Sequence, residues 1–332
     1  MIDRPLSIAD LSVGPGQSLS GSVSLNITGV PLRLPLFLVN GAQPGPRLSI
    51  TAGIHGAEYA SIEAALRLGR GLDPEAVRGQ VIIAPIANPP AFTARSIYVS
   101  PPDGKNLNRQ FPGQAKGTFS QALAGWLFEE VIRPADAFID LHGGDLIEAL
   151  EPFVIYFHSG DEEVDRASRA LACSFGIHYV VEGETPGSSY GSAAQIGIPG
   201  ILAEAGGQGI WDEDSVGTLQ AGVLRAMAHV GMIDPLAPGH VACKGLGASA
   251  FEGVRAPVVL DQWVWLRSDA DGLFYPAVAV GTQVRAGQNL GRVADLDGNT
   301  RQSLSAPIDG TILFLVTALA MNAGDPLLAL GN

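Results

Sequence analysis

The chain has 332 residues, of which 46% are apolar, and it carries a formal net charge of −13 at pH 7. A chain of this length and apolar content can bury a large core and is expected to form two domains. The excess of acidic residues argues against nucleic acid or an anionic membrane as a partner, because either would need a basic face.

Apolar runs alternate with helical patterns from residue 33 to residue 230. This alternation predicts an α/β fold with a mostly parallel, helix-covered sheet. The predicted strands cover residues 33–39, 47–52, 80–87, 136–142, 153–157, 177–181 and 198–204. The predicted crossover helices cover residues 60–72, 120–132, 162–175 and 216–230.

A long loop interrupts this alternation between residues 88 and 119. It is rich in Pro, Gly and Asn, and a loop of this length within a compact domain usually carries function. The loop contains Asn108 and Arg109. We therefore expect it to contribute residues to a site.

The sequence pattern changes after residue 233. Residues 234–239 have the composition of a linker, and beyond them short strand-like runs are separated by Gly and Asp turns. We therefore divide the chain into a catalytic domain, residues 1–233, and a small all-β domain, residues 240–332, that resembles a barrel. The second domain contains two weakly similar segments of the kind that build biotinyl and lipoyl carriers. Its only lysine, Lys244, lies outside both segments, so we expect a structural role.

The start of the chain and its cysteines predict the cellular compartment. The first sixteen residues contain Asp3, Asp10 and two prolines, so we expect no secretory signal. The longest apolar run, residues 311–321, is too short to span a bilayer. Cys173 and Cys243 lie in apolar surroundings, as free thiols of a reducing compartment do. We expect a cytoplasmic protein without a membrane partner; the sequence leaves a homo-oligomer open.

The strand predicted at residues 47–52 ends in Gly53-Ile54-His55-Gly56-Ala57-Glu58. Glu58 falls in the first turn of the next helix, so His55 and Glu58 can face one point, with a spacing typical of metal ligands. A surface histidine followed by a glutamate that the helix dipole stabilises would give the same pattern. A metal site therefore needs a third ligand from elsewhere in the chain.

Two further strands end on an ionisable residue that glycines follow, namely His142 and Glu204. Ligands of open α/β sheets gather at the carboxyl ends of strands, so we expect these residues in one crevice. Two histidines and one carboxylate with an open fourth position are the composition of a catalytic zinc site. Glu204 is then the natural general base, although a strand-terminal glutamate that caps a turn or pairs with an arginine is the alternative. The other histidines have no second ligand nearby and are assigned no chemistry: His158, His178, His229 and His240.

The loop adds a fourth motif, Asn-Leu-Asn-Arg-x-Phe-Pro-Gly, at residues 106–113. The succession of this motif with His-x-x-Glu, Asp-Leu-His and Glu-x-Gly-Gly resembles the succinylglutamate desuccinylase and aspartoacylase family, relatives of the zinc carboxypeptidases. The resemblance covers about residues 45 to 210. The sequence of residues 100–109 most resembles that of the branch of the N-acetyl-diaminobutyrate deacetylases. The resemblance implies a zinc carboxypeptidase-like fold.

The resemblance also implies the roles of the strand-end residues. One zinc ion per chain would be held by His55, Glu58 and His142, and Glu204 would be the catalytic acid/base. Zinc lowers the pKa of a bound water, and a neighbouring carboxylate can take its proton and pass it to a leaving amine.

For the substrate, the resemblance implies that Asn108 and Arg109 grip a carboxylate, a task suited to a planar guanidinium. Aspartoacylase-like members carry a Tyr and, four residues on, an Arg ahead of the catalytic Glu, whereas this chain has Tyr190 and then Ala194. The second carboxylate-binding arginine is therefore missing. We expect neutral or basic amino-acid derivatives to be better substrates than acidic ones such as those of aspartate.

A second departure concerns the oxyanion of the reaction. Family members place an oxyanion-polarising Arg several residues before the Asn-Arg pair, but the corresponding residues 96–100 read Ser-Ile-Tyr-Val-Ser. The nearest arginine is Arg95. Arg95 and Tyr190 are therefore the candidates for this contact.

Together these features predict a zinc-dependent amidohydrolase that removes a small acyl group from an N-acyl amino acid or a similar small metabolite. A carboxypeptidase or an esterase would use the same centre and is the alternative among enzymes. A metabolite-binding protein without catalysis is the alternative from another class, and the presence of Glu204 beside three intact ligands disfavours it.

Overall fold

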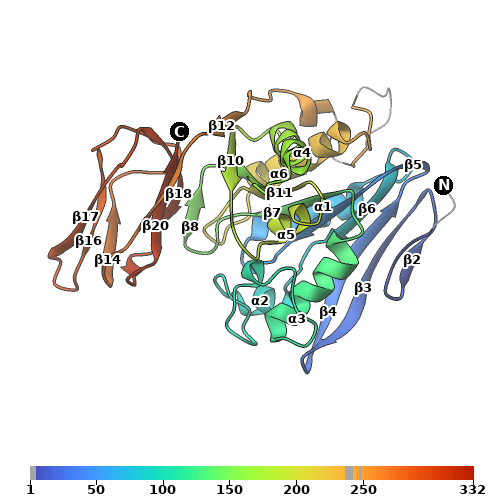
Figure 1. Ribbon diagram of the computed structural model, residues 1–332, viewed down its shortest axis with the longest axis horizontal. Helices are drawn as coiled ribbons and strands as arrows, with labels where there is room; N and C mark the ends of the chain where they lie inside the picture. The colour runs from blue at the N-terminus through green and yellow to red at the C-terminus, as the bar shows by residue number, and fades with distance from the viewer. Residues whose placement is uncertain (1–4, 236–241, 245, 247) are drawn as a thin grey trace.

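The computed structural model describes residues 5–235, 242–244, 246 and 248–332. Its largest element is a nine-stranded sheet with the strand order β12-β10-β9-β11-β7-β5-β6-β4-β3 (Figure 1). Pairing is parallel from β11 through β7 and β5 to β6 and from β12 through β10 to β9, and antiparallel elsewhere. A hairpin of two short strands, β1 and β2, precedes the sheet. The strands are β1 (Leu6–Ile8), β2 (Leu11–Val13), β3 (Gln17–Ile27), β4 (Val30–Asn40), β5 (Gln43–Ala52), β6 (Arg78–Ala84), β7 (Ala137–His142), β9 (Phe153–Phe157), β10 (Tyr179–Gly183), β11 (Gly200–Glu204) and β12 (Val258–Leu260).

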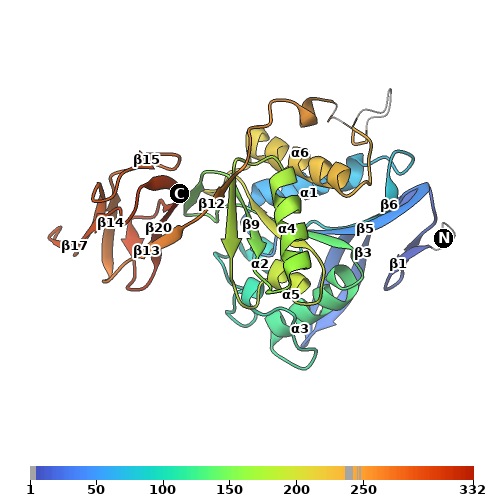
Figure 2. The same cartoon turned by 45° about the horizontal axis from the view of Figure 1, so that its top comes forward.

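Helices cover both faces of this sheet (Figure 2). Successive side chains of β6 point to opposite faces, so Val81 and Ile83 join one apolar core while Ile82 and Ala84 join the other. The first core also takes side chains from α1, α4 and α6, and the second from α3 and α5. The helices are α1 (Tyr59–Gly71), α2 (Pro89–Ala94), η1 (Leu107–Arg109), α3 (Phe119–Leu127), η2 (Phe128–Ile132), α4 (Glu162–Ser174), α5 (Ser189–Ala194), α6 (Glu213–His229) and η3 (Ala248–Phe251).

Local chemistry explains where these elements begin. Asp161 caps α4, because its carboxylate accepts hydrogen bonds from the free backbone N–H groups of Glu163 and Val164. Strand β7 is buried along its whole length, as expected for a strand that helices cover on both faces. The strand therefore holds His142, the residue at its carboxyl end, in a rigid position.

The C-terminal strands form two further antiparallel sheets that lie to one side of the main sheet (Figure 1). One sheet also contains β8, a short strand of the catalytic part that pairs with β18. Conversely, β12 of the C-terminal part pairs with β10 of the main sheet. Each part therefore contributes a strand to a sheet of the other. Trp263 packs against Phe153, with ring centroids 5.2 Å apart, where the two parts meet. These strands are β8 (Glu148–Leu150), β13 (Trp263–Arg267), β14 (Gly272–Pro276), β15 (Gln283–Val284), β16 (Asn289–Ala294), β17 (Thr300–Ser305), β18 (Gly310–Val316), β19 (Ala320–Met321) and β20 (Pro326–Gly331).

The predicted fold class is confirmed: a mostly parallel, helix-covered sheet is followed by a C-terminal all-β region. The long loop of residues 88–119 contains two short helices, α2 and η1, that were not predicted. Residues 236–239 of the predicted linker lie outside the described residues, as does His240. Within the described part of the chain, no helix is long and apolar enough to cross a membrane.

Candidate active site

A strand, a tight turn and a helix position the first two site residues. Strand β5 ends at Ala52, and Gly53 turns the chain with a φ of +65°, a conformation that favours glycine. A Cβ at Gly56 would lie only 2.1 Å from the carbonyl carbon of Ala91, so α2 can approach the turn only because this residue is glycine. Glu58 is the N-cap of α1 but makes no capping hydrogen bond with its side chain. Its carboxylate turns instead toward two histidines.

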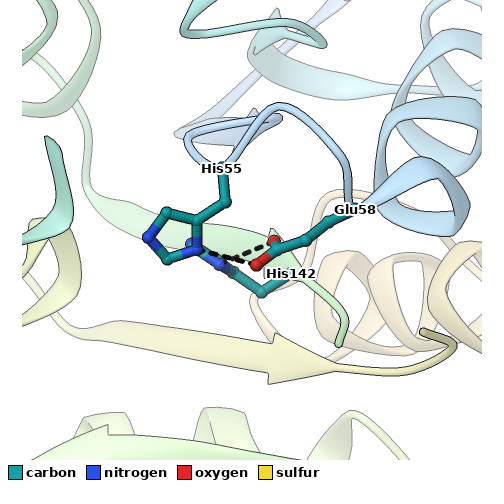
Figure 3. A group of neighbouring side chains, drawn as sticks. All are labelled: His55, Glu58 and His142. Carbon is teal, nitrogen blue, oxygen red and sulfur yellow. Dashed lines mark hydrogen bonds and ion pairs between the residues drawn. The ribbon is translucent and has the colours of Figure 1, made fainter. Parts of the chain in front are cut away.

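His55, Glu58 and His142 point toward one another (Figure 3). The Nδ1 atom of His55 lies 2.7 Å from Oε1 of Glu58, and the Nδ1 atom of His142 lies 2.9 Å from Oε2. One donor atom of each residue lies within 4.8 Å of the other two. The predicted ligands, which come from two different strand ends, therefore form one group that could hold a metal ion.

Charge and burial act against each other in this group. Burial opposes ionisation of Glu58, but the two neighbouring histidines outweigh it and lower the pKa of Glu58 to about 2. Burial likewise opposes protonation of His55 and His142, yet the charge of Glu58 raises the pKa of both. The group therefore favours negative charge on Glu58 and positive charge beside it, and a bound cation would compete with protons for the same ligand atoms.

Each histidine has a second hydrogen-bond partner on its outer nitrogen. Asp140 and His142 point to the same face of β7, and Asp140 Oδ2 lies 3.1 Å from His142 Nε2. Thr51 and Ser189 donate hydrogen bonds to this buried aspartate and hold it in place. Such partners fix the histidine tautomer and leave Nδ1 free for a metal.

On His55 the corresponding partner is Asn106. Its Oδ1 atom lies 3.1 Å from His55 Nε2 and also accepts the backbone N–H of Asn108. No role was predicted for Asn106 or Asp140 from the sequence. Asp140 could have been found from the sequence, because it stands two residues before His142 on a strand and so shares its face. Asn106 could not, because it meets His55 only after the loop has folded.

Glu204 lies beside the group, since β11 and β7 pair in register with Glu204 opposite His142. Its Oε2 atom is buried and has no hydrogen-bond partner among the described residues. Burial, followed by the charges of Glu58, Glu148 and Asp140, raises the pKa of Glu204 well above its usual range, although His142 opposes the shift. A carboxyl group that is poorly solvated and free of partners is suited to exchange protons with a substrate or a water.

Asn108 and Arg109 lie in η1, close to His142. Asn108 is buried; its Nδ2 atom lies 3.4 Å from His142 Nε2, and its Oδ1 accepts the backbone N–H of Ser189. Arg109 keeps exposed surface, and desolvation lowers its pKa. Among the described residues, no carboxylate pairs with Arg109, whose NH1 atom donates to the carbonyl of Asn108. Arg109 can therefore accept an external anion.

Neither Arg95 nor Tyr190 forms a hydrogen bond with the metal-binding group among the described residues. Arg95 is exposed at the C-terminal end of α2, and within the described residues no hydrogen bond or ion pair joins it to the histidines or glutamates of the site. Tyr190 is buried in α5 with its ring against Phe157, and its hydroxyl has no hydrogen bond among the described residues.

A second acidic group, which offers the next candidates for the base after Glu204, lies beside the site. Asp145 and Glu148 follow His142 in the chain, and both are buried. Burial raises the pKa of Glu148 to about 7, even though the backbone N–H of Asp145 and the hydroxyl of Tyr98 donate to it. The contact of Asp145 and Glu148 with Tyr98 was not predicted, because Tyr98 comes from a distant part of the chain.

Comparison with known proteins agrees with the fold. Residues 44–230 match the family model of the succinylglutamate desuccinylase/aspartoacylase catalytic domain. The N-alpha-acetyl-L-2,4-diaminobutyric acid deacetylase of Halomonas elongata is 28% identical over 301 residues, which are 88% of this chain and 83% of that protein.

Two solved structures extend the likeness to nearly the whole chain. A succinylglutamate desuccinylase/aspartoacylase from Rhodobacter sphaeroides is 27% identical, with a TM-score of 0.80 over 98% of this chain and 99% of its own. The product-bound ectoine utilization protein EutE (DoeB) from Ruegeria pomeroyi is 25% identical, with a TM-score of 0.84 over 99% of this chain and 98% of its own.

A mixed, helix-covered sheet with a His-Glu-His group at its strand ends defines the chain as an α/β protein with a candidate metal centre. The chain belongs to the succinylglutamate desuccinylase/aspartoacylase family. The resemblance found in the sequence is thereby confirmed, and the chain is an amidohydrolase.

Proposed function

We propose that this amidohydrolase removes a small acyl group from an N-acyl amino acid, using one zinc ion held by His55, Glu58 and His142. The proposal rests on one observation, the convergence of two imidazole nitrogens and a carboxylate beside Glu204. In a family of deacylases, an open group of this composition supports catalysis more than a structural role for the metal.

The donor set suits zinc. Two imidazoles and one carboxylate leave a position for water or substrate, and both histidines have acceptors on their outer nitrogens, as metal-bound histidines usually do. A bound zinc ion would supply Lewis acidity that polarises the scissile carbonyl and acidifies water. The remaining tasks fall to the protein.

Glu204 carries the protons in this proposal. Its carboxylate would take a proton from the attacking water and return it to the nitrogen of the leaving amine. Burial raises the pKa of Glu204 above its usual range, so its carboxylate accepts a proton more readily than a solvated carboxylate would. Its unpartnered Oε2 supports the same step.

Arg109 is our candidate for recognition of the α-carboxylate, with Asn108 beside it. The support is an arginine that no carboxylate pairs with among the described residues, next to the metal-binding group. Ala194 is buried and offers no second guanidinium, so we propose that the acylated amino acid of the substrate is neutral or basic. The diaminobutyrate named for the Halomonas relative has a basic side chain and agrees with this choice.

We also propose that the enzyme works in the cytoplasm, where the free thiols of Cys173 and Cys243 would stay reduced.

Metal analysis and a substrate screen test the proposal together. We expect about one zinc per chain, and hydrolysis of N-acetyl amino acids that a chelator abolishes and zinc restores. Dipeptides and carboxylic esters belong in the same panel, since preferred cleavage of either would replace the proposal with a carboxypeptidase or an esterase. Full activity after complete removal of metal would contradict the zinc mechanism.

A further inference from the structure

We propose that Tyr98 and Glu148 form a positioning pair that fastens the loop of residues 95–109 to the C-terminal β region. The loop carries Asn106, Asn108 and Arg109, so the kinetic part of this inference rests on the proposed function. Neither member of the pair is assigned a contact with the substrate.

Two hydrogen bonds hold Tyr98. Its hydroxyl donates to Oε1 of Glu148 over 2.7 Å, and its backbone N–H donates to Oδ2 of Asp145 over 2.9 Å. The two acidic residues are themselves linked, because the backbone N–H of Asp145 donates to Oε2 of Glu148 over 2.8 Å. Backbone and side chain of one tyrosine are thus bound to one rigid group.

The backbone of Tyr98 is in the left-handed conformation, which a tyrosine adopts only where neighbouring residues stabilise it. Its φ is +59°, in the left-handed region that bulky residues avoid. Surroundings that supply specific contacts are needed to keep such a residue in place. The bonds from Asp145 and Glu148 are the contacts that do so here.

The connection continues from Tyr98 to the substrate-binding residues. Two residues on, Ser100 and Lys105 form an antiparallel bridge that closes the tip of the loop. Asn106, the partner of His55, follows Lys105 directly. A displacement of Tyr98 would therefore reach Asn106 through the Ser100–Lys105 bridge.

On the other side, Glu148 belongs to a strand of the C-terminal sheet. It is the first residue of β8 and pairs with Val316 of β18. The backbone N–H of Thr317 donates to the carbonyl of Ile147 over 2.7 Å, immediately before Glu148. The C-terminal region thereby sets the position of Glu148, and Glu148 sets that of Tyr98.

Three variants test the pair: Tyr98→Phe, which removes only the hydroxyl, Glu148→Gln, which keeps the shape, and the double variant. We expect each single variant to raise KM about 10-fold while kcat changes by less than about 3-fold, the scale of one lost hydrogen bond to a charged group. The double variant should be no worse than either single one, because both remove the same bond. The exposed Tyr275, changed to Phe, is the matched control and should leave KM unaltered.

Backbone amide hydrogen exchange in residues 95–109 gives a readout without turnover. We expect exchange to quicken about 10-fold in both single variants and not in Tyr275→Phe. If no N-acyl amino acid were hydrolysed, the proposed function would fail while exchange would still test the pair. Unchanged exchange, or KM effects that add in the double variant, would overturn the inference. A fall of kcat in Glu148→Gln alone would do the same, since it would give Glu148 a chemical role.

A variant in the C-terminal region tests the other half of the connection. Thr317→Pro removes the N–H that bonds to Ile147, whereas Thr317→Ala keeps it, and this exposed side chain lies outside the site. We expect only the proline variant to quicken exchange in residues 95–109, by at least about 3-fold. Equal exchange in the two variants at equal melting temperature would show that the C-terminal region does not support the loop.

Discussion

Glu204 lies directly opposite His142 in the register of two parallel strands, β11 and β7. Backbone hydrogen bonds of the sheet, and not a mobile loop, therefore determine the separation of the carboxyl group from the metal-binding histidine. Both strands are buried for nearly their full length. Rigid elements of this kind hold reacting groups within the small tolerances that catalysis requires.

Glu204→Gln should keep the shape of the side chain and remove the proton acceptor. We expect turnover to fall by at least about 100-fold, the usual scale for a positioned acid/base, with little change in substrate affinity. Single-turnover kinetics and a binding assay on the same preparation separate the two effects. Glu184→Gln, on an exposed side chain, is the control. Near-normal turnover in Glu204→Gln would transfer the role of base to Asp145 or Glu148.

His55→Ala or His142→Ala should each strip zinc from the protein. Two remaining ligands hold zinc poorly, whereas the large apolar cores do not depend on metal, so the circular dichroism spectrum should stay close to that of the parent. Metal content per chain after dialysis is the measurement. His178→Ala, on a half-buried histidine outside the metal-binding group, should retain the metal. Full retention in both ligand variants would show that the metal binds elsewhere.

Arg109→Ala should reduce catalytic efficiency by roughly 30- to 150-fold, because a charge-assisted pair with a carboxylate contributes about 2 to 3 kcal/mol. Substrates with an α-amide in place of the carboxylate should lose a similar factor with the parent enzyme. Arg285→Ala, in the C-terminal region, serves as the control. N-acetylaspartate should be a poorer substrate than N-acetyl derivatives of neutral or basic amino acids. The assignment is wrong if N-acetylaspartate is the best of the panel.

Glu148→Gln should change how stability depends on pH. Burial raises the pKa of Glu148 from 4.5 to about 7, so the folded protein retains a proton that the unfolded chain loses between these values. The free energy of unfolding of the parent should therefore fall, relative to the variant, by up to about 3 kcal/mol as the pH rises from 4.5 to 7. Urea unfolding of both proteins across this range measures the difference, with the exposed Glu252→Gln as the control. Parallel curves would show that Glu148 is ionised throughout.

Much of the fold could be predicted because the buried strands are continuous apolar runs. Strands covered on both faces need apolar residues at most positions, so β5, β7 and β11 stand out in the sequence, and so do the residues that end them. The edge strand β3 was not predicted. Its serines face solvent at alternate positions, and this breaks the run of apolar residues.

The surroundings of the metal-binding group could be predicted only in part. Asp140 shares a strand face with His142, which local geometry reveals, but Asn106 meets His55 through a loop whose path depends on the whole fold. The contacts of Tyr98 with Asp145 and Glu148 depend on the same path. Sequence periodicity carries no information on such encounters between distant segments.

The exchange of strands between the two parts of the chain limits how the protein can be divided. Cutting the chain at residues 234–239 would separate two stretches of sequence, but β8 would remain with one piece and its partner β18 with the other. A chimaera that joins this catalytic part to the C-terminal part of a relative would need a matching edge for β8. A substitution that reshapes the edge of β8 would therefore require a compensating substitution in β18.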